Sequence, residues 1–523
     1  MLVASALAIA VFFVFGGALG LYFAQEDFRG LAVAKGLLPR HASLWRYVSV
    51  QGFMDLFYPL FGTHPKPYHF VSIALHAANA ALLFSLLARR LAPVAAMVAA
   101  GFFAAHPVLF TAIYWQSARS DILATTFGLC TVVLALRRGR ERWLAVPSFA
   151  LAVLSKESVV FLPLALWLIR RWARKADPGD GAIRDLLIPA LCLLSGGYGL
   201  YLLLGKAGIT VGTGPNAAYA LDFGMPLLQN LMTYVGWTID VTMRPSALGF
   251  VDVRNPDIFG LAIGSLIAWG VAALLPGLRT RGWLAAGATF LLLLVPVLPL
   301  RNHTYHYFLY APLAAASWCL GAVVDLAMAP RAPRRTKGSR RPGGERTEGT
   351  VSEKVARGKF AAWLVAGACL VLLTWNGARL VRRMETRPLV ALPGLRGDPI
   401  VDRSIIARNA LDGLQGAQLP QGVEITFLFR DRLALLARIA LGSGEAPAPG
   451  EEVYVERNLR TAVFDGYGVR AMIPQVAKVA FALEPPPASS RSLYAVYAPT
   501  GETEVFSRVG LDSLMRSPWV NQW

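Results

Sequence analysis

The residues best suited to chemistry in this sequence are charged side chains placed beside long apolar runs. Three such pairs stand at the ends of runs: Glu26-Asp27, Arg119 with Asp121, and Lys156-Glu157. Ionisable groups at membrane depth are costly, so each pair suggests a function. A carboxylate can take a proton from a hydroxyl group, and Arg or Lys can hold a phosphate. The pattern favours a reaction with an anionic leaving group at a membrane surface.

More polar residues flank the same runs. They are Arg46, His69, His106, His303 and His306. Arg46 adds a cation that can hold phosphate, and the histidines together with Asp121 and Glu157 are candidates for substrate binding. Plainer interpretations stay open. Arg119 and Asp121 can be a local ion pair at a helix start, and His106 before Pro107 can simply end a helix.

The elements that position these residues are membrane helices. The 523 residues are 55% hydrophobic and only 16% charged, with a mean hydropathy of +0.48. This composition excludes a soluble chain and indicates a polytopic membrane protein. The net charge of +19 comes from Lys and Arg in short loops, so it indicates topology and not nucleic-acid binding. All four cysteines lie in apolar runs, so none of them indicates a disulfide framework or a thiolate metal site.

The apolar runs predict about eleven spans. Their ranges are 1–23, 69–88, 92–107, 119–136, 143–155, 158–169, 186–204, 258–276, 282–299, 305–326 and 360–377. Basic clusters between them belong in the cytoplasm by the positive-inside rule, with the N-terminus. The amphipathic stretch 225–245 is assigned to an external interfacial helix. The charged pairs then converge on the external face, and two short spans meet at Lys156-Glu157.

The rest of the chain divides into further segments. Residues 1–329 form the predicted catalytic membrane domain, and 330–359 form a basic cytoplasmic linker rich in Arg, Gly and Pro. The last span, 360–377, leads to residues 378–523 outside the membrane. Alternating strands at 423–429, 492–498 and 502–508, with amphipathic helices at 403–414 and 430–441, predict a small α/β domain.

Four quoted stretches carry a family resemblance. They are "YHFVSIALHAANAALLFSLLARR", "GFFAAHPVLFTAIYWQSARSDILA", "LAVLSKESVVFLPLALWL" and "VLPLRNHTYHYFLYAPLAAA". With the acidic pair after the first span they resemble the polytopic GT-C glycosyltransferases over roughly residues 20–320. The nearest pattern is the membrane part of transmembrane and tetratricopeptide-repeat O-mannosyltransferases and their bacterial relatives. Unlike those enzymes, this chain has no tetratricopeptide repeats after the membrane part.

The resemblance implies a transferase that uses a polyprenyl-phosphate-linked sugar. Asp27 or Glu26 would then be the catalytic base, with Asp27 preferred, and Arg119 and Lys156 would meet the lipid phosphate. His306 stands where relatives often have Arg, so it would contribute a hydrogen bond or a charge. The acceptor would be a protein, a lipid or a cell-surface glycan. We expect a multi-pass protein of the bacterial inner membrane.

Two other classes fit the same charges. One is a transporter or flippase of lipid-linked sugars, although the charges gather on one face and do not line a path across the bilayer. The other is an inactive scaffold that presents the C-terminal domain. No cofactor is required, and a divalent metal is compatible with the site, although the sequence has neither a zinc motif nor a dedicated cage of oxygen ligands.

Overall fold

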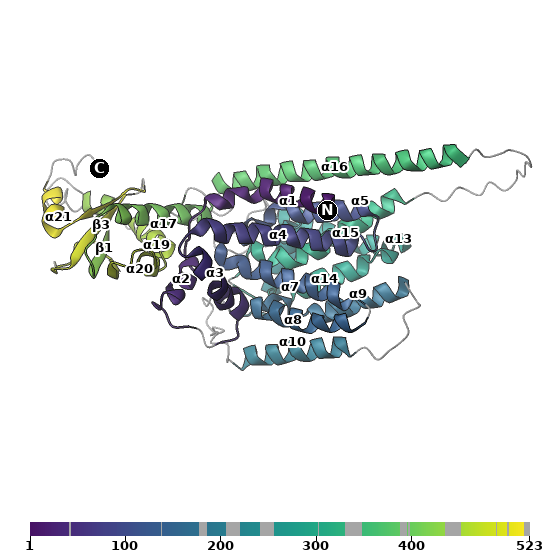
Figure 1. Cartoon of the computed structure of the whole chain (residues 1–523), viewed down its shortest axis with the longest axis horizontal. Helices are drawn as coiled ribbons and strands as arrows, with labels where there is room; N and C mark the ends of the chain where they lie inside the picture. Colours follow the sequence, from purple (N-terminus) through teal and green to yellow (C-terminus); the bar gives the residue numbers. More distant parts are fainter. Residues whose placement is uncertain are drawn as a thin grey trace, which may run out of the picture.

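The computed structural model describes residues 1–40, 43–137, 139–176, 186–204, 220–240, 256–301, 303–329, 348–386, 395, 398–434, 451–487, 489–498 and 501–516. Helices dominate it, and a small mixed domain lies at one end of a long helical bundle (Figure 1). The bundle helices are α1 (Leu2–Phe15), α4 (Pro65–Leu87), α5 (Pro93–Ala105), α7 (Arg119–Ala135), α8 (Ala145–Ser155), α9 (Leu162–Ala176), α10 (Leu187–Leu203), α11 (Met225–Trp237), α12 (Pro256–Ala272), α14 (Trp283–Leu294), α15 (Tyr310–Met328) and α16 (Glu348–Thr386). Shorter helices are α2 (Asp27–Ala34), α3 (Phe53–Phe61), α6 (Phe110–Tyr114) and α13 (Pro276–Thr280).

Several helices are long and apolar enough to cross a membrane. Five such helices occur in the described ranges, or six if the pair Pro93–Ala105 and Pro107–Tyr114, bent by 42°, counts as one span. The protein is therefore an integral membrane protein. A helix lies at each of the eleven predicted ranges, but α8, α9, α10, α12 and α14 have 17 residues or fewer. Such helices are shorter than the apolar thickness of a bilayer, so the count of eleven stays a prediction.

The bundle core is built around α5. Its small side chains let α4, α15 and α16 approach closely, as small residues do in membrane helix interfaces. His76 of α4 joins this core: its Nδ1 lies 2.7 Å from the Tyr310 hydroxyl, and its Nε2 lies 3.1 Å from the Ala104 carbonyl. A buried histidine therefore connects three helices through hydrogen bonds and stays within the packed interface.

Basic loops come together at the end of the bundle away from α2. The Arg281 Nε lies 2.5 Å from Asp325, whose other oxygen accepts the Ala92 backbone N–H at 2.7 Å. Trp172 donates to the Thr280 carbonyl at 3.1 Å in the same region. This grouping is what the charge-based topology requires, while the direction of the bundle in the membrane stays a prediction. Residues 330–347 of the predicted linker lie outside the described residues, and 348–359 begin α16.

The chain breaks where two short spans are predicted to meet. Helix α8 ends at Ser155, Lys156 is extended, and a 3-10 turn, η6 (Glu157–Val159), leads to α9. This confirms the predicted break and brings two charged residues to the α2 end of the bundle. Helix α11 confirms a helix within 225–245; residues 241–245 lie outside the described part.

The C-terminal domain is a four-stranded sheet with helices. Its elements are α17 (Pro399–Gly416), β1 (Val423–Phe429), α19 (Glu451–Ala462), α20 (Tyr467–Met472), β2 (Val476–Phe481), β3 (Ser492–Tyr497), β4 (Thr503–Phe506) and α21 (Arg508–Met515). The strand order is β2-β1-β3-β4, with β1 parallel to both neighbours and β4 antiparallel to β3. The three predicted strands and the helix at 403–414 are confirmed. The helix predicted at 430–441 begins as expected, and its part beyond residue 434 lies outside the described residues.

A test of the packing uses two glycines of α16. A Cβ at Gly377 would collide with the Ala105 carbonyl of α5, whereas a Cβ at Gly367 would meet no atom within 4 Å. We expect Gly377→Ala to lower the free energy of unfolding by about 1–3 kcal/mol through overpacking. The matched variant Gly367→Ala should leave stability unchanged or raise it slightly. Thermal unfolding in detergent micelles measures both; equal melting temperatures would contradict the close α5–α16 approach.

Candidate active site

A cavity of about 360 Å³ opens at the α2 end of the bundle. It lies where α2, the loop before α3, the start of α7 and the break after α8 meet. The residues predicted from the sequence that line it are Glu26, Asp27, Arg46, Arg119, Lys156 and His303. Asp121 and Glu157 bind two of these cations from outside the lining. His69, His106 and His306 do not line the cavity. The chain therefore gathers residues that are more than 250 positions apart into one polar chamber.

Asp27 is held in place by three hydrogen bonds. It is the first residue of α2, and its Oδ1 accepts from the backbone N–H of Ser117 at 2.7 Å and from the Ser117 hydroxyl at 2.8 Å. Its Oδ2 accepts from the Ala24 N–H at 3.2 Å. Burial raises the pKa of Asp27 to about 7, although these hydrogen bonds act in the opposite direction. The carboxyl is thus poised to exchange a proton near neutral pH. Glu26, by contrast, is exposed.

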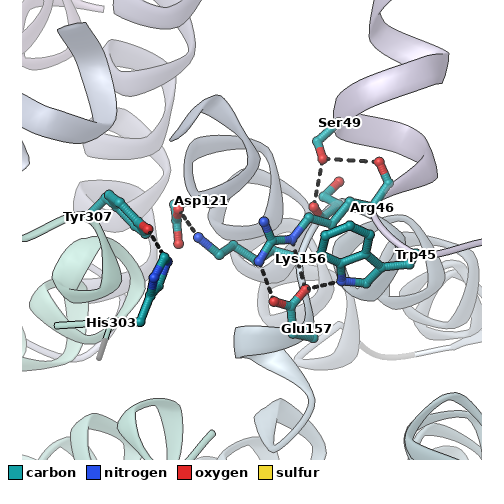
Figure 2. Close-up of polar contacts among 9 residues, drawn as sticks. Trp45, Arg46, Ser49, Asp121, Lys156, Glu157, His303 and Tyr307 are labelled. Carbon is teal, nitrogen blue, oxygen red and sulfur yellow. Dashed lines mark hydrogen bonds and ion pairs between the residues drawn. The ribbon is translucent and has the colours of Figure 1, made fainter. Parts of the chain in front are cut away.

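A buried ion pair joins α7 to the break after α8. The Lys156 ammonium donates to the Asp121 carboxylate, and the two residues are 1% and 4% exposed. The Lys156 Nζ also lies 4.4 Å from the Tyr307 ring centroid and 4.6 Å from that of Phe308. Cation–π contacts of this kind add to the stabilisation of a desolvated ammonium. Figure 2 shows Lys156 extending between Asp121 and the neighbouring Arg46.

A second ion pair fixes the loop before α3. Arg46 contacts both carboxylate oxygens of Glu157, with a distance of 3.0 Å from its Nε to Oε2 (Figure 2). The Trp45 indole donates to the same Oε2 at 3.2 Å. The Ser49 hydroxyl donates to the Ser155 carbonyl at 2.7 Å. These contacts lock the loop against the end of α8, with Arg46 and Lys156 adjacent at the cavity wall.

Arg119 has different partners from the other two cations. Its Nη1 donates to Gln116 at 3.0 Å and its Nη2 to the Ser49 carbonyl at 3.3 Å, so its hydrogen bonds in the described structure go to neutral oxygens. Its guanidinium lies 3.5 Å from the Phe53 ring centroid, and its Nε has no hydrogen-bond partner among the described atoms. A buried guanidinium with a spare donor is suited to bind an anion.

The histidines have separate structural roles. The His69 Nδ1 lies 2.8 Å from Gln116, the amide that also accepts from Arg119, so His69 supports the guanidinium indirectly. His303 lines the cavity and contacts the Tyr307 hydroxyl at 2.9 Å (Figure 2). Burial and the nearby charges of Lys156 and Arg46 lower the pKa of His303 to about 3, which keeps it neutral.

The other two histidines contact residues away from the cavity. The His106 Nδ1 accepts from the Val108 N–H at 3.2 Å, which caps the turn after α5, and its Nε2 lies 3.2 Å from the Thr238 carbonyl. The ring of His306 lies 4.1 Å from that of Trp237. His106 therefore ends a helix in the way that the plainer interpretation describes.

Several site residues were not expected from the sequence. Ser117 binds Asp27, Gln116 joins His69 to Arg119, and Trp115 lines the cavity with an indole N–H that has no hydrogen-bond partner among the described atoms. All three lie in the short stretch before Arg119, so proximity to the R-x-D motif was the only available signal. Among the described residues, no group of three or more His, Cys, Asp or Glu side chains is placed to hold a metal.

One comparison with known proteins finds a match. Residues 50–177 match the family model described as dolichyl-phosphate-mannose-protein mannosyltransferase. The matched range contains Arg119, Asp121, Lys156 and Glu157, whereas Asp27, Arg46 and His303 lie outside it. No curated protein and no solved structure matches the chain. The match confirms the resemblance to GT-C O-mannosyltransferases for this range and supports a membrane glycosyltransferase.

The Lys156–Asp121 pair offers a test of site stability. We expect Asp121→Asn to lower the free energy of unfolding by about 3 kcal/mol, because it leaves a buried ammonium without a counter-charge. Adding Lys156→Met should recover much of that loss. The exposed pair Arg40–Asp55, at 3.1 Å, gives the control: Asp55→Asn should change stability by less than about 1 kcal/mol. Thermal unfolding in detergent measures all four proteins, and a double variant less stable than Asp121→Asn would contradict the pairing.

Proposed function

We propose that this protein transfers a sugar from a polyprenyl-phosphate donor to the hydroxyl group of an acceptor at the external membrane surface. The observation that supports this most is the shared cavity of Asp27 and Arg119. Ser117 holds the Asp27 carboxylate and lies only two residues before Arg119. Asp27 as proton acceptor and Arg119 as anion-binding group would then lie in the same cavity, as a displacement with a phosphate leaving group needs.

The proposed reaction is a single displacement. The Asp27 carboxylate removes the proton of the acceptor hydroxyl as its oxygen forms a bond to the anomeric carbon. The bond between that carbon and the phosphate oxygen breaks, and its electron pair leaves with the lipid phosphate. Arg119, supported by Lys156 and Arg46, stabilises the developing charge. Attack opposite to the leaving group inverts the anomeric configuration. Glu26, exposed beside Asp27, is the less suitable base because its carboxylate is not held by comparable bonds in the described structure.

A second cavity suits the lipid tail of the donor. It has a volume of about 410 Å³ and lies among α4, α7, α9, α14 and α15, lined mainly by Leu, Val, Ile and Ala side chains. Thr125, one turn after Asp121, and Val159, three residues after Lys156, belong to its lining. The prenyl chain would enter there with its phosphate toward Lys156 and Arg119. Burial of apolar chain atoms at about 25 cal/mol per Å² would supply much of the donor affinity.

We also propose an acceptor class and an orientation in the membrane. The acceptor is a protein, a lipid or a cell-surface glycan, and it reaches the cavity from outside the bacterial inner membrane. The N-terminus and the basic loops would lie in the cytoplasm. The proposal does not require a divalent metal, because the Arg119 guanidinium, whose hydrogen bonds in the described structure go to neutral oxygens, would hold the phosphate. No contact in the described structure favours a transporter, which stays an outcome of the experiment.

The decisive test replaces the proposed base. In nanodiscs, with radiolabelled polyprenyl-phosphate sugars and membrane or cell-wall acceptors, we expect Asp27→Asn to lower kcat by about 10²–10⁴-fold, because it removes general-base catalysis. Donor binding should be unchanged. The wild-type kcat/KM should rise with pH through about 7 and then level off, since Asp27 must be deprotonated to act.

Glu26→Gln is the matched control, and it should retain most of the activity. Loss of transfer in Glu26→Gln with activity kept in Asp27→Asn would assign the base to Glu26. Equal transfer by wild type and Asp27→Asn would refute Asp27. Lipid binding without transfer by the wild type would favour the transporter.

Trp115 gives a prediction about donor recognition. Trp115 lines the cavity and its indole N–H has no hydrogen-bond partner among the described atoms, and a buried unsatisfied donor costs free energy that a ligand can recover. We expect Trp115→Phe to raise KM for the donor about tenfold with little change in kcat. Trp167, half exposed on α9 at 46%, supplies the control Trp167→Phe, which should behave as wild type. An unchanged KM in Trp115→Phe would exclude this hydrogen bond.

A further inference from the structure

The C-terminal domain packs directly on the segment that carries the acidic pair (Figure 1). One hydrophobic cluster contains side chains of both parts: Phe23, Phe28 and Leu31 from the segment, and Ala407, Leu411, Val463 and Val469 from the domain. A Cβ at Gly468 of α20 would lie 2.8 Å from the Phe28 ring, so the two surfaces are in close contact. The C-terminal domain therefore packs against α2 and supports its position.

Backbone groups of the acidic segment are hydrogen-bonded by the same domain. The Tyr22 N–H donates to the Ser404 hydroxyl at 2.7 Å, and the Gln25 N–H donates to the Ala462 carbonyl at 2.9 Å. The Arg403 Nη1 donates to the Gln25 side-chain carbonyl, also at 2.9 Å. Gln25 is thus bound through its backbone and its side chain by two different helices, α17 and α19.

Gln25 has an unusual backbone conformation. Its φ is +57°, in the left-handed region that side chains other than glycine seldom adopt, and the residue is 8% exposed. Such a conformation costs about 1–3 kcal/mol and persists when surrounding contacts enforce it. The Gln25 carbonyl then accepts the Phe28 N–H at 3.1 Å, which turns the chain into α2 two residues before Asp27. The conformation of Gln25 therefore sets the point at which α2 begins, and with it the position of the Asp27 carboxylate.

We infer that Arg403 is a positioning residue for catalysis: by holding Gln25 in the left-handed conformation, it sets the Asp27 carboxylate against Ser117. The inference rests on the proposed role of Asp27 as base. Arg403 is not among the residues that line the cavity, and it acts through its hydrogen bond to Gln25. The C-terminal domain consequently contributes to turnover and is more than a support or an acceptor-binding module.

The first experiment separates positioning from substrate binding. In the nanodisc assay we expect Arg403→Met to lower kcat at least tenfold while donor KM changes less than twofold, because the cations around the phosphate are untouched. Arg403→Lys should lie between it and the wild type. Arg508 of α21, whose Nε lies 3.0 Å from Asp512 within the domain, gives the control Arg508→Met, which should keep full activity. A parallel rise in KM, or loss of activity in Arg508→Met as well, would overturn the inference.

The second experiment tests whether Arg403 acts through Asp27. Adding Arg403→Met to Asp27→Asn should cause no further loss of the residual rate, since residues that act as one unit are not additive. A merely structural role would lower the rate by the same factor in both backgrounds, and that result would overturn the inference.

Hydrogen–deuterium exchange at residues 20–34 supplies a readout that needs no transfer. We expect at least tenfold faster exchange in Arg403→Met than in the wild type and Arg508→Met, with bundle helices unchanged. If the wild type transfers no sugar, the proposed function fails, yet faster exchange would still show that Arg403 holds the segment. Unchanged exchange would overturn the inference whatever the transfer result.

Discussion

The buried pair between Lys156 and Asp121 is the interaction on which the arrangement of the site depends. Burying the Lys156 ammonium, which is 1% exposed, without a counter-charge would cost much free energy. Its partner Asp121 lies in the first turn of α7, so the start of α7 has to lie beside the end of α8. That requirement explains the extended conformation of Lys156 and the turn that follows it. It also places Glu157 where Arg46 can reach it, so the second pair follows from the first.

Pairing leaves the three cations unequal. Lys156 and Arg46 are each paired with a carboxylate. These two ion pairs stabilise the fold and fix the residues of the cavity wall. Arg119 keeps neutral partners and one Nε donor without a partner in the described structure. In the proposed reaction, a singly charged phosphate would bind the Arg119 guanidinium, and the two neighbouring ion pairs would respond as negative charge develops. The neutral His303 adds polarity without adding charge.

The sequence predicts the parts of this structure that depend on local pattern. Apolar periodicity located the helices, and alternation located the strands β1, β3 and β4. The charged residues at helix ends are recognisable in the sequence because an ionised side chain at membrane depth is costly and is usually functional. The partner of Asp27 was not recognisable, because Ser117 is an ordinary small polar residue until tertiary packing brings it to the carboxylate. The number of membrane spans cannot be established from the apolar runs alone, because runs such as 143–155 form helices too short to be assigned as complete spans.

The position of Asp27 is determined from two sides that are distant in sequence. Ser117 approaches from the bundle, while Ala462 and Arg403 approach from the C-terminal domain through Gln25. A carboxyl whose pKa is raised by burial is sensitive to small displacements, because each hydrogen bond gained or lost changes its proton affinity. Holding Gln25, two residues before Asp27, in the left-handed conformation restricts the motion of the segment. In the proposed mechanism, the membrane bundle supplies the cations, and the C-terminal domain supplies the rigidity that a base at a loop–helix junction would otherwise lack.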